Sequence, residues 1–255
     1  MRRALAQTAA GFEPESHLPP DLANLAGATI ALDLDGALVD TAPDLVDTLN
    51  VVLGAEGVAS LAMETARPMI GAAARALIAR GFAAAGQPLP EARLNELFER
   101  FVTHYRAHIA DRSRAFPGVP EALDALAGAG ARLAVCTNKR TDLAVALLEA
   151  LDLAERFDAI VGADLVPAGK PDPGHLIAAI GRAGGRRDRA VMVGDSVWDA
   201  RAARAAAIPL VLVSFGYTDI PARDLGPDIL IDHFDQLPGA CARLIAACPI
   251  SGERP

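Results

Sequence analysis

The sequence predicts an α/β fold: a doubly wound, Rossmann-like parallel sheet with an all-helical segment inserted after the first strand. Six short apolar runs alternate with Ala- and Leu-rich helical stretches. Runs that are apolar on both faces are typical of parallel strands covered by helices on both sides. Between residues 42 and 114, in contrast, apolar residues recur only at helical spacing. The six runs span residues 28–32, 132–136, 159–161, 190–193, 210–213 and 229–231.

This pattern divides the chain into three parts. Residues 1–27 carry Gly and Pro without periodicity, which predicts a weakly ordered extension. Residues 28–41 and 115–255 are predicted to form the α/β core, and residues 42–114 a helical cap. An insertion at this point would lie over the carboxyl edge of the sheet, where such folds bind ligands. Within the cap, helices are predicted over residues 43–55, 69–82 and 91–110.

Length and charge narrow the class of protein further. The 255 residues are 52% apolar, and 32 acids against 24 bases give a net charge of −8. An acidic chain has little attraction for nucleic acid or for an anionic membrane surface, so we expect neither partner. No stretch approaches the ~20 apolar residues of a membrane span, and residues 1–27 lack the apolar run of a secretion signal. We therefore expect a cytoplasmic protein.

Polar side chains follow four of the predicted strands or their loops. Because parallel strands end at the same edge of a sheet, these groups are expected to lie close together. Two acids follow the first strand, a hydroxyl and an amide the second, a lysine before proline a later loop, and two more acids the fourth strand. In order, they are Asp33, Asp35, Thr137, Asn138, Lys170, Asp195 and Asp199.

The chemistry of these groups predicts phosphoryl transfer. Converging carboxylates repel one another unless a cation intervenes, and oxygen ligands suit a hard cation such as Mg²⁺. A lysine and a hydroxyl beside that cation are suited to the oxygens of a phosphoryl group. A metal, a phosphate site and a free carboxylate together predict a phosphoryl-transfer enzyme.

The same residues resemble the four motifs of the haloacid dehalogenase superfamily. These are DLDG at 33–36, TN at 137–138, KP at 170–171 and GDSVWD at 194–199. Within that superfamily, the segments at 33–47, 135–139 and 214–219 are similar to those of bacterial phosphoglycolate phosphatases. The resemblance implies a Mg²⁺-dependent phosphatase that hydrolyses 2-phosphoglycolate, a small phosphorylated acid, through an aspartyl-phosphate.

The resemblance also implies roles for the two acids of the first loop. Asp33 would attack phosphorus, and Asp35 would protonate the leaving alkoxide and later deprotonate water. Asp33, the backbone carbonyl of Asp35, and Asp195 would hold Mg²⁺.

Further roles follow for residues at the other strand ends and in the cap. Thr137, the Asn138 backbone and Lys170 would bind the transferring oxygens, while Asp199 would orient Lys170 or the metal waters. In the cap, Arg67 and Gly71 would face the non-reacting end of the substrate.

Other positions lead to three separate expectations. Lys139 has no role in these motifs, and we predict that it lies on the surface. The family usually has Thr or Val where this chain has Ala37, which predicts slower chemistry. Thr41 and Asp44 have the spacing of a helix cap.

Other functions stay open at this stage. A phosphatase or phosphomutase for another small phosphomonoester, such as a sugar phosphate, would carry the same motifs. A non-catalytic phosphate-binding module is a second alternative, and the sequence leaves open whether the chain forms a homodimer.

Overall fold

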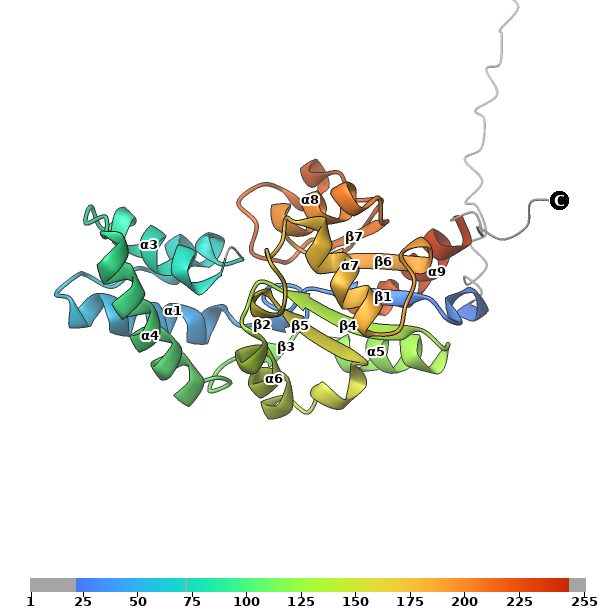
Figure 1. Ribbon diagram of the computed structural model, residues 1–255, viewed down its shortest axis with the longest axis horizontal. Coiled ribbons are helices and arrows are strands. Elements are labelled where there is room, and N and C mark those ends of the chain that lie inside the picture. Colours follow the sequence, from blue (N-terminus) through green and yellow to red (C-terminus); the bar gives the residue numbers. More distant parts are fainter. Residues whose placement is uncertain (1–21, 72, 248–255) are drawn as a thin grey trace, which may run out of the picture.

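The computed structural model describes residues 22–71 and 73–247. Its centre is a six-stranded sheet in the order β5-β4-β1-β6-β7-β8, in which every neighbouring pair is parallel (Figure 1). The predicted fold class is confirmed, and each of the six apolar runs corresponds to one strand. The strands are β1 (Thr29–Leu32), β4 (Arg132–Thr137), β5 (Ala159–Gly162), β6 (Ala190–Gly194), β7 (Leu210–Val213) and β8 (Ile229–Ile231).

Helices cover both faces of this sheet because its strands are apolar on both sides. In β1, Ile30 and Leu32 join one buried cluster, whereas Ala31 between them joins another. One cluster includes α5 (Val119–Gly128), α6 (Thr141–Ala150) and α9 (Leu237–Ala247). The other includes α7 (Pro173–Arg182) and α8 (Val197–Ala206). In Figure 1, α8 lies above the strands and α5 lies below them.

The inserted helices form a separate layer beyond the carboxyl edge of the sheet (Figure 1). Large apolar side chains from three of them, Leu49, Phe82 and Phe101, are buried in a cluster of their own. The helices are α1 (Ala42–Ala55), α2 (Met63–Ala66), α3 (Ala74–Ala84) and α4 (Glu91–Ala107).

One of the predicted cap helices was wrong in its extent. The pattern placed a helix over residues 69–82, but α3 begins only at Ala74, and the short helix α2 was missed. The backbone φ angles of Gly71 and Ala73 are 107° and 86°, which a right-handed helix does not allow. Apolar spacing alone does not reveal such a break.

The chain leaves and re-enters the core through a short two-stranded sheet. In it β2 (Val39–Asp40) pairs antiparallel with β3 (Arg114–Ala115), and the amide of Phe116 donates to the carbonyl of Leu38 at 3.0 Å. These strands were not predicted, since two residues are too few to show a period. They lie next to the predicted cap boundaries, which stay a prediction.

The expected Thr41–Asp44 helix cap is wrong. Thr41 stands before the first residue of α1, but its hydroxyl donates to Asp35 Oδ1 at 2.7 Å. Asp44 is buried and accepts from the backbone amides of Arg112 and Ser113 and from the Ser113 hydroxyl. Asp44 thus accepts hydrogen bonds from the segment in which the chain returns to the core, and not from the amides at the start of α1.

The predicted extension, residues 1–27, lies mostly outside the described residues. Within its described part, residues 22–25 form a 3₁₀ turn.

No helix within residues 22–71 and 73–247 has the length and apolar character needed to cross a bilayer. The 3₁₀ segments are Leu22–Leu25, Arg67–Met69, Ala154–Arg156, Ala163–Leu165, Arg187–Arg189, Ala222–Leu225 and Phe234–Gln236.

Candidate active site

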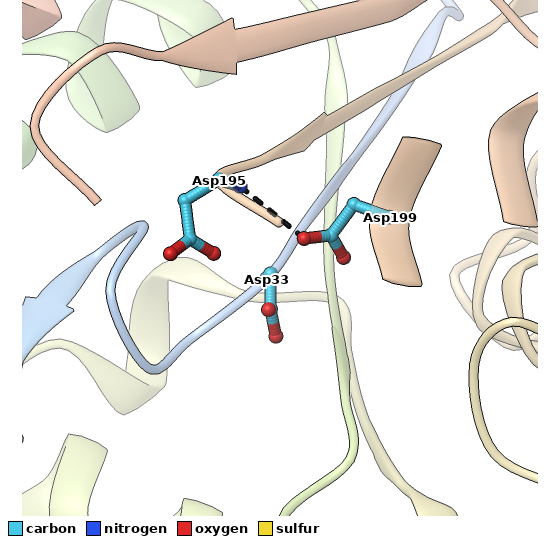
Figure 2. Close-up of side chains that lie close together, drawn as sticks. All are labelled: Asp33, Asp195 and Asp199. Carbon is cyan, nitrogen blue, oxygen red and sulfur yellow. Dashed lines mark hydrogen bonds between the residues drawn. The ribbon is translucent and has the colours of Figure 1, made fainter. Parts of the chain in front are cut away.

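Three carboxylates meet where β1 and β6 end. Asp33 follows β1, Asp195 follows β6, and Asp199 lies in the first turn of α8. One oxygen from each lies within 4.8 Å of the others, and all three residues are buried (Figure 2). Since β1 and β6 are neighbours in the sheet, the topology itself brings these acids together.

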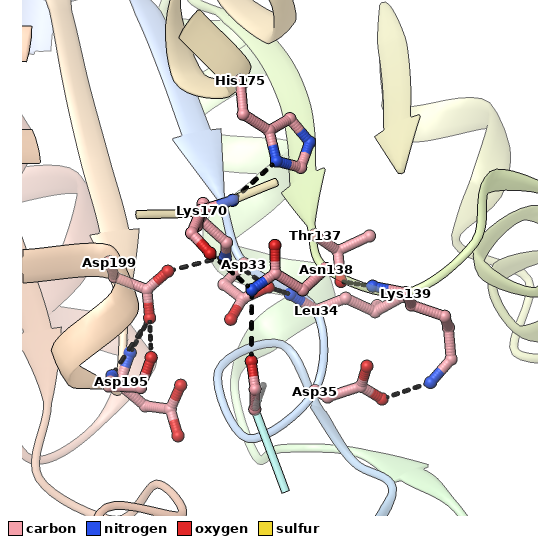
Figure 3. A network of polar contacts seen from close by, with 12 residues as sticks. Asp33, Leu34, Asp35, Thr137, Asn138, Lys139, Lys170, His175, Asp195 and Asp199 are labelled. Atoms are coloured by element: carbon pink, nitrogen blue, oxygen red, sulfur yellow. Dashed lines mark hydrogen bonds and ion pairs between the residues drawn. The ribbon is translucent and has the colours of Figure 1, made fainter. Parts of the chain in front are cut away.

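Lys170 is the cation that joins two of these acids (Figure 3). Its Nζ lies 2.8 Å from Asp33 Oδ1 and 2.6 Å from Asp199 Oδ1, and only 1% of its side chain is exposed. A buried ammonium with two carboxylate partners is held in a fixed place, because each carboxylate accepts a charge-assisted hydrogen bond from it.

Asp199 is fixed by the start of the helix that carries it. Its Oδ2 accepts from the amides of Asp195 and Ser196 and from the Ser196 hydroxyl, the last at 2.7 Å. Its other oxygen is thereby left to face Lys170. Asp199 thus ties together the lysine and the loop that carries Asp195.

Two glycines leave room for the Asp195 carboxylate. A Cβ at Gly36 would lie 2.5 Å from Asp195 Oδ2, and a Cβ at Gly216 would lie 2.1 Å from Asp195 Cβ. The amide of Tyr217 donates to Asp195 Oδ2 at 2.7 Å. Tyr217 lies in the segment at 214–219 that carried part of the resemblance, so a sequence signal for it existed.

The electrostatics of the cluster favour a bound cation. Burial, together with the charges of Asp199 and Asp35, raises the pKa of Asp33 to about 7 in spite of Lys170. Burial and the charges of Asp199 and Asp33 also raise the pKa of Asp195 well above its ordinary value. A divalent ion between Asp33 and Asp195 would offset this repulsion, so this oxygen donor set fits a hard metal ion.

Thr137 is the last residue of β4 and Asn138 follows it; β4 pairs with β1 on the side away from β6. The Thr137 hydroxyl accepts from the amide of Lys139 at 3.2 Å. The Asn138 side-chain amide donates to the carbonyls of Lys170 and Gly71, at 3.1 and 3.3 Å (Figure 3). Asn138 thus links the lysine loop to the inserted segment.

Lys139 is buried, so its predicted surface position is wrong. Its Nζ lies 2.6 Å from Asp35 Oδ1 and 4.8 Å from the centre of the Tyr105 ring. Although burial alone would lower the pKa of Lys139, the charge of Asp35 raises it above its ordinary value. Lys139 is buried beside Tyr105 of α4, which lies 34 positions earlier in the chain. The sequence around Lys139 therefore gives no indication of this contact.

His175 is a further buried residue that the sequence reasoning missed. Its Nδ1 accepts from the amide of Lys170 at 3.2 Å, and its Nε2 donates to the carbonyl of Val161 at 3.0 Å. Burial lowers the pKa of His175 to about 4, so the ring is neutral. The sequence feature that could have pointed to His175 is its position five residues after Lys170.

A cavity of about 280 Å³ lies between the sheet edge and the inserted helices. Its walls include the predicted residues Asp33, Asp35, Thr137, Asn138 and Gly71.

Arg67 is not among the residues that line this cavity. Its guanidinium donates to both oxygens of Asp40, at 2.8 and 2.9 Å, and lies 5.0 Å from the Tyr217 ring centre. The predicted contact of Arg67 with a substrate therefore stays a prediction.

Comparisons with known proteins agree with this architecture. A family model described as haloacid dehalogenase-like hydrolase matches residues 30–213. A phosphoglycolate phosphatase of Caulobacter vibrioides is 54% identical over 228 residues, 89% of this chain and 96% of that protein. One of Agrobacterium fabrum is 50% identical over 205 residues, 80% of this chain and 88% of that protein. The crystal structure of a predicted phosphoglycolate phosphatase from Haemophilus somnus has a TM-score of 0.76 and 29% identity, covering 82% of this chain and 96% of that one.

These matches, together with the acid-rich sheet edge, define an enzyme of the phosphoric monoester hydrolase class. The chain belongs to the haloacid dehalogenase-like hydrolase family, because the family model spans more than half of its length. The resemblance predicted from the four motifs is confirmed.

Proposed function

We propose that this enzyme hydrolyses 2-phosphoglycolate to glycolate and inorganic phosphate, with Asp33 as nucleophile and Mg²⁺ as cofactor. The proposal is carried by one observation: a buried carboxylate, Asp33, lies 2.8 Å from the Lys170 ammonium in the wall of a small cavity. The two relatives named phosphoglycolate phosphatase support the choice of substrate.

In the first half of the reaction, a carboxylate oxygen of Asp33 bonds to phosphorus and the ester bond breaks. Asp35 gives a proton to the leaving alkoxide, which departs as glycolate. Thr41 and Lys139 both donate to Oδ1 of Asp35, so its Oδ2 is the oxygen that exchanges the proton. In the second half, Asp35 takes a proton from water, whose oxygen bonds to phosphorus and releases phosphate from Asp33.

Other side chains hold the transferring group in place. The Lys170 ammonium, the Thr137 hydroxyl and the backbone N–H of Asn138 bind the phosphoryl oxygens, and Asp199 keeps Lys170 oriented. The carboxylates of Asp33 and Asp195 and the backbone carbonyl of Asp35 would hold Mg²⁺. When bound, the cation supplies positive charge that lets an anionic nucleophile approach a phosphate dianion.

A panel of phosphomonoesters tests the substrate. We expect the highest kcat/KM for 2-phosphoglycolate, and loss of activity in a metal chelator with recovery on adding Mg²⁺. The panel should include hexose phosphates and 2-hydroxyethyl phosphate, which lacks the carboxylate. A flat profile, or one that peaks on a hexose phosphate, would refute the substrate assignment.

The nucleophile is tested by Asp33→Asn, which preserves shape and removes the charge. We expect kcat to fall by at least about 10³-fold. A hydroxylamine-sensitive label from radiolabelled substrate should form on the wild type and be missing in the variant. Asp188→Asn is the matched control, because Asp188 is paired with Arg186 on the exposed surface. Hydrolysis by Asp33→Asn at the parent rate would sink the assignment.

A further inference from the structure

The cavity contains two polar groups that the reaction steps above leave unused. Lys139 and Tyr105 both line it, and both side chains are almost completely buried. The oxygen of the Tyr105 hydroxyl has the Lys139 ammonium as a donor beside it, but the hydroxyl proton has no acceptor among the described residues. A buried hydroxyl proton without an acceptor is costly, so its place in a cavity wall points to an anionic ligand that would accept it.

Lys139 likewise has a donor to spare. An ammonium has three N–H groups; the Asp35 carboxylate takes one and the Tyr105 oxygen a second, which leaves the third for a ligand. The Lys139 Nζ lies 4.8 Å from the Tyr105 ring centre, so the two groups can reach one small anion. Burial raises the pKa of Tyr105 to about 12, which keeps its hydroxyl a neutral donor at physiological pH.

The position of Lys139 beside Asp35 indicates which end of a substrate Lys139 would contact. The group that protonates the leaving oxygen must touch that oxygen, and Lys139 Nζ lies 2.6 Å from Asp35. Whatever is attached to the ester oxygen therefore lies beside Lys139. In a phosphorylated 2-hydroxy acid, the carboxylate begins one carbon beyond the ester oxygen.

Other cations near the cavity are engaged elsewhere. Arg75 donates to Glu91 and Asn95, and Arg140 donates to both oxygens of Asp142. Arg67 is held by Asp40 outside the cavity. Apolar side chains such as Leu45, Phe101 and Leu143 form much of the remaining wall. An ion pair formed beside an apolar wall is stronger than one formed in water, because the local dielectric constant is lower.

We propose that Lys139 and Tyr105 form the subsite for the carboxylate of a small phosphorylated acid, with Lys139 as the ion partner and the Tyr105 hydroxyl as a second donor. This inference rests on the proposed function, because it assigns the acidic end of that substrate. It makes Lys139 and Tyr105 specificity residues, which select the acid over a neutral ester of the same size.

The test compares kcat/KM for 2-phosphoglycolate with kcat/KM for 2-hydroxyethyl phosphate. Lys139→Gln keeps a donor for Asp35 but removes the charge, and Tyr105→Phe removes only the hydroxyl. We expect the acid-to-neutral ratio to fall about 10- to 100-fold in Lys139→Gln and about 3- to 10-fold in Tyr105→Phe. Arg186→Met, which removes an exposed surface cation paired with Asp188, is the control, and its ratio should stay at the parent value; Arg67→Met tests the alternative that the carboxylate meets Arg67.

Several outcomes would overturn the inference. An equal loss on both esters would mean that Lys139 acts only through Asp35, and an unchanged ratio in both variants would mean that neither residue meets the carboxylate. A ratio that falls in Arg67→Met instead would place the carboxylate at Arg67. If Lys139→Gln fails to fold by circular dichroism, Tyr105→Phe decides.

Failure of the proposed function has a different signature. The parent enzyme would then show no preference for 2-phosphoglycolate over the neutral ester. If the parent has that preference and both variants keep it, the substrate assignment stands and only the subsite is refuted.

Discussion

The chain has only two lysines, and both are buried against aspartates at the same edge of the sheet. The Lys170 cluster contains Asp33, Lys170, Asp195 and Asp199. The Lys139 cluster contains Asp35, Lys139, Thr41 and Tyr105. In the first, the ammonium lies between two carboxylates, whereas in the second it has one carboxylate and an aromatic ring.

The clusters also differ in where their members come from. All four residues of the Lys170 cluster belong to the ends and loops of the α/β core, so the sheet topology alone assembles it. The Lys139 cluster takes Tyr105 from α4 of the inserted helices. The Lys170 cluster therefore suits the steps that are common to all substrates, whereas the Lys139 cluster suits discrimination among substrates.

The largest effect is expected from Lys170→Met. This change leaves two buried carboxylates without their cation, so we expect kcat to fall about 10²- to 10³-fold on every ester. Breaking a buried ion pair also costs about 3–5 kcal/mol of unfolding free energy. Steady-state kinetics and denaturant titration measure the two effects. A change in the acid-to-neutral ratio instead of a uniform loss would erase the distinction between the clusters.

Asp199→Asn is expected to have an intermediate effect. The amide can keep one acceptor toward the Ser196 backbone, but it loses the charge that orients Lys170 at 2.6 Å. We expect a loss of about 10- to 100-fold in kcat/KM, again equal for acidic and neutral esters. Asp188→Asn, which alters an exposed ion pair with Arg186, is the matched control. A loss no greater than that of the control would show that Lys170 is held without Asp199.

The two clusters also differ in how far sequence alone could predict them. The Lys170 cluster was predictable because each member directly follows a strand or starts a helix, and parallel strands end at one edge. Lys139 was placed wrongly because its neighbours on either side carry no sign of Tyr105, which reaches it through tertiary packing. The contacts of Arg67 with Asp40 and Tyr217 could not be predicted for the same reason, because the three residues are distant in sequence.

A pH-dependent effect on stability is expected from His175, which supports the Lys170 backbone. Burial lowers its pKa to about 4, below the ordinary value of about 6.5 that it regains on unfolding. Between these values the unfolded chain binds more protons, so this contribution to stability falls as the pH falls. The advantage of the parent over His175→Gln should shrink by about 2 kcal/mol between about pH 7.5 and about pH 5.

Denaturant titrations of both proteins across this range measure that difference. His108→Gln is the control, because the His108 ring is exposed and paired with Asp111 at the surface. Parallel stability curves for the parent and His175→Gln would contradict the assignment of a neutral buried ring.

The smallest effect is expected from Thr41→Val, which tests the Lys139 cluster from within. The Thr41 hydroxyl donates to Asp35 Oδ1 at 2.7 Å, the same oxygen that Lys139 contacts. Valine fills the same space, so we expect a loss of about 1 kcal/mol in stability and a few-fold loss in kcat/KM. Because Thr41 touches Asp35 and does not line the cavity, the loss should be equal for 2-phosphoglycolate and 2-hydroxyethyl phosphate. A fall in the acid-to-neutral ratio as large as that of Lys139→Gln would show that disturbing Asp35 is enough to change selectivity, and Lys139 would then need no contact with the carboxylate.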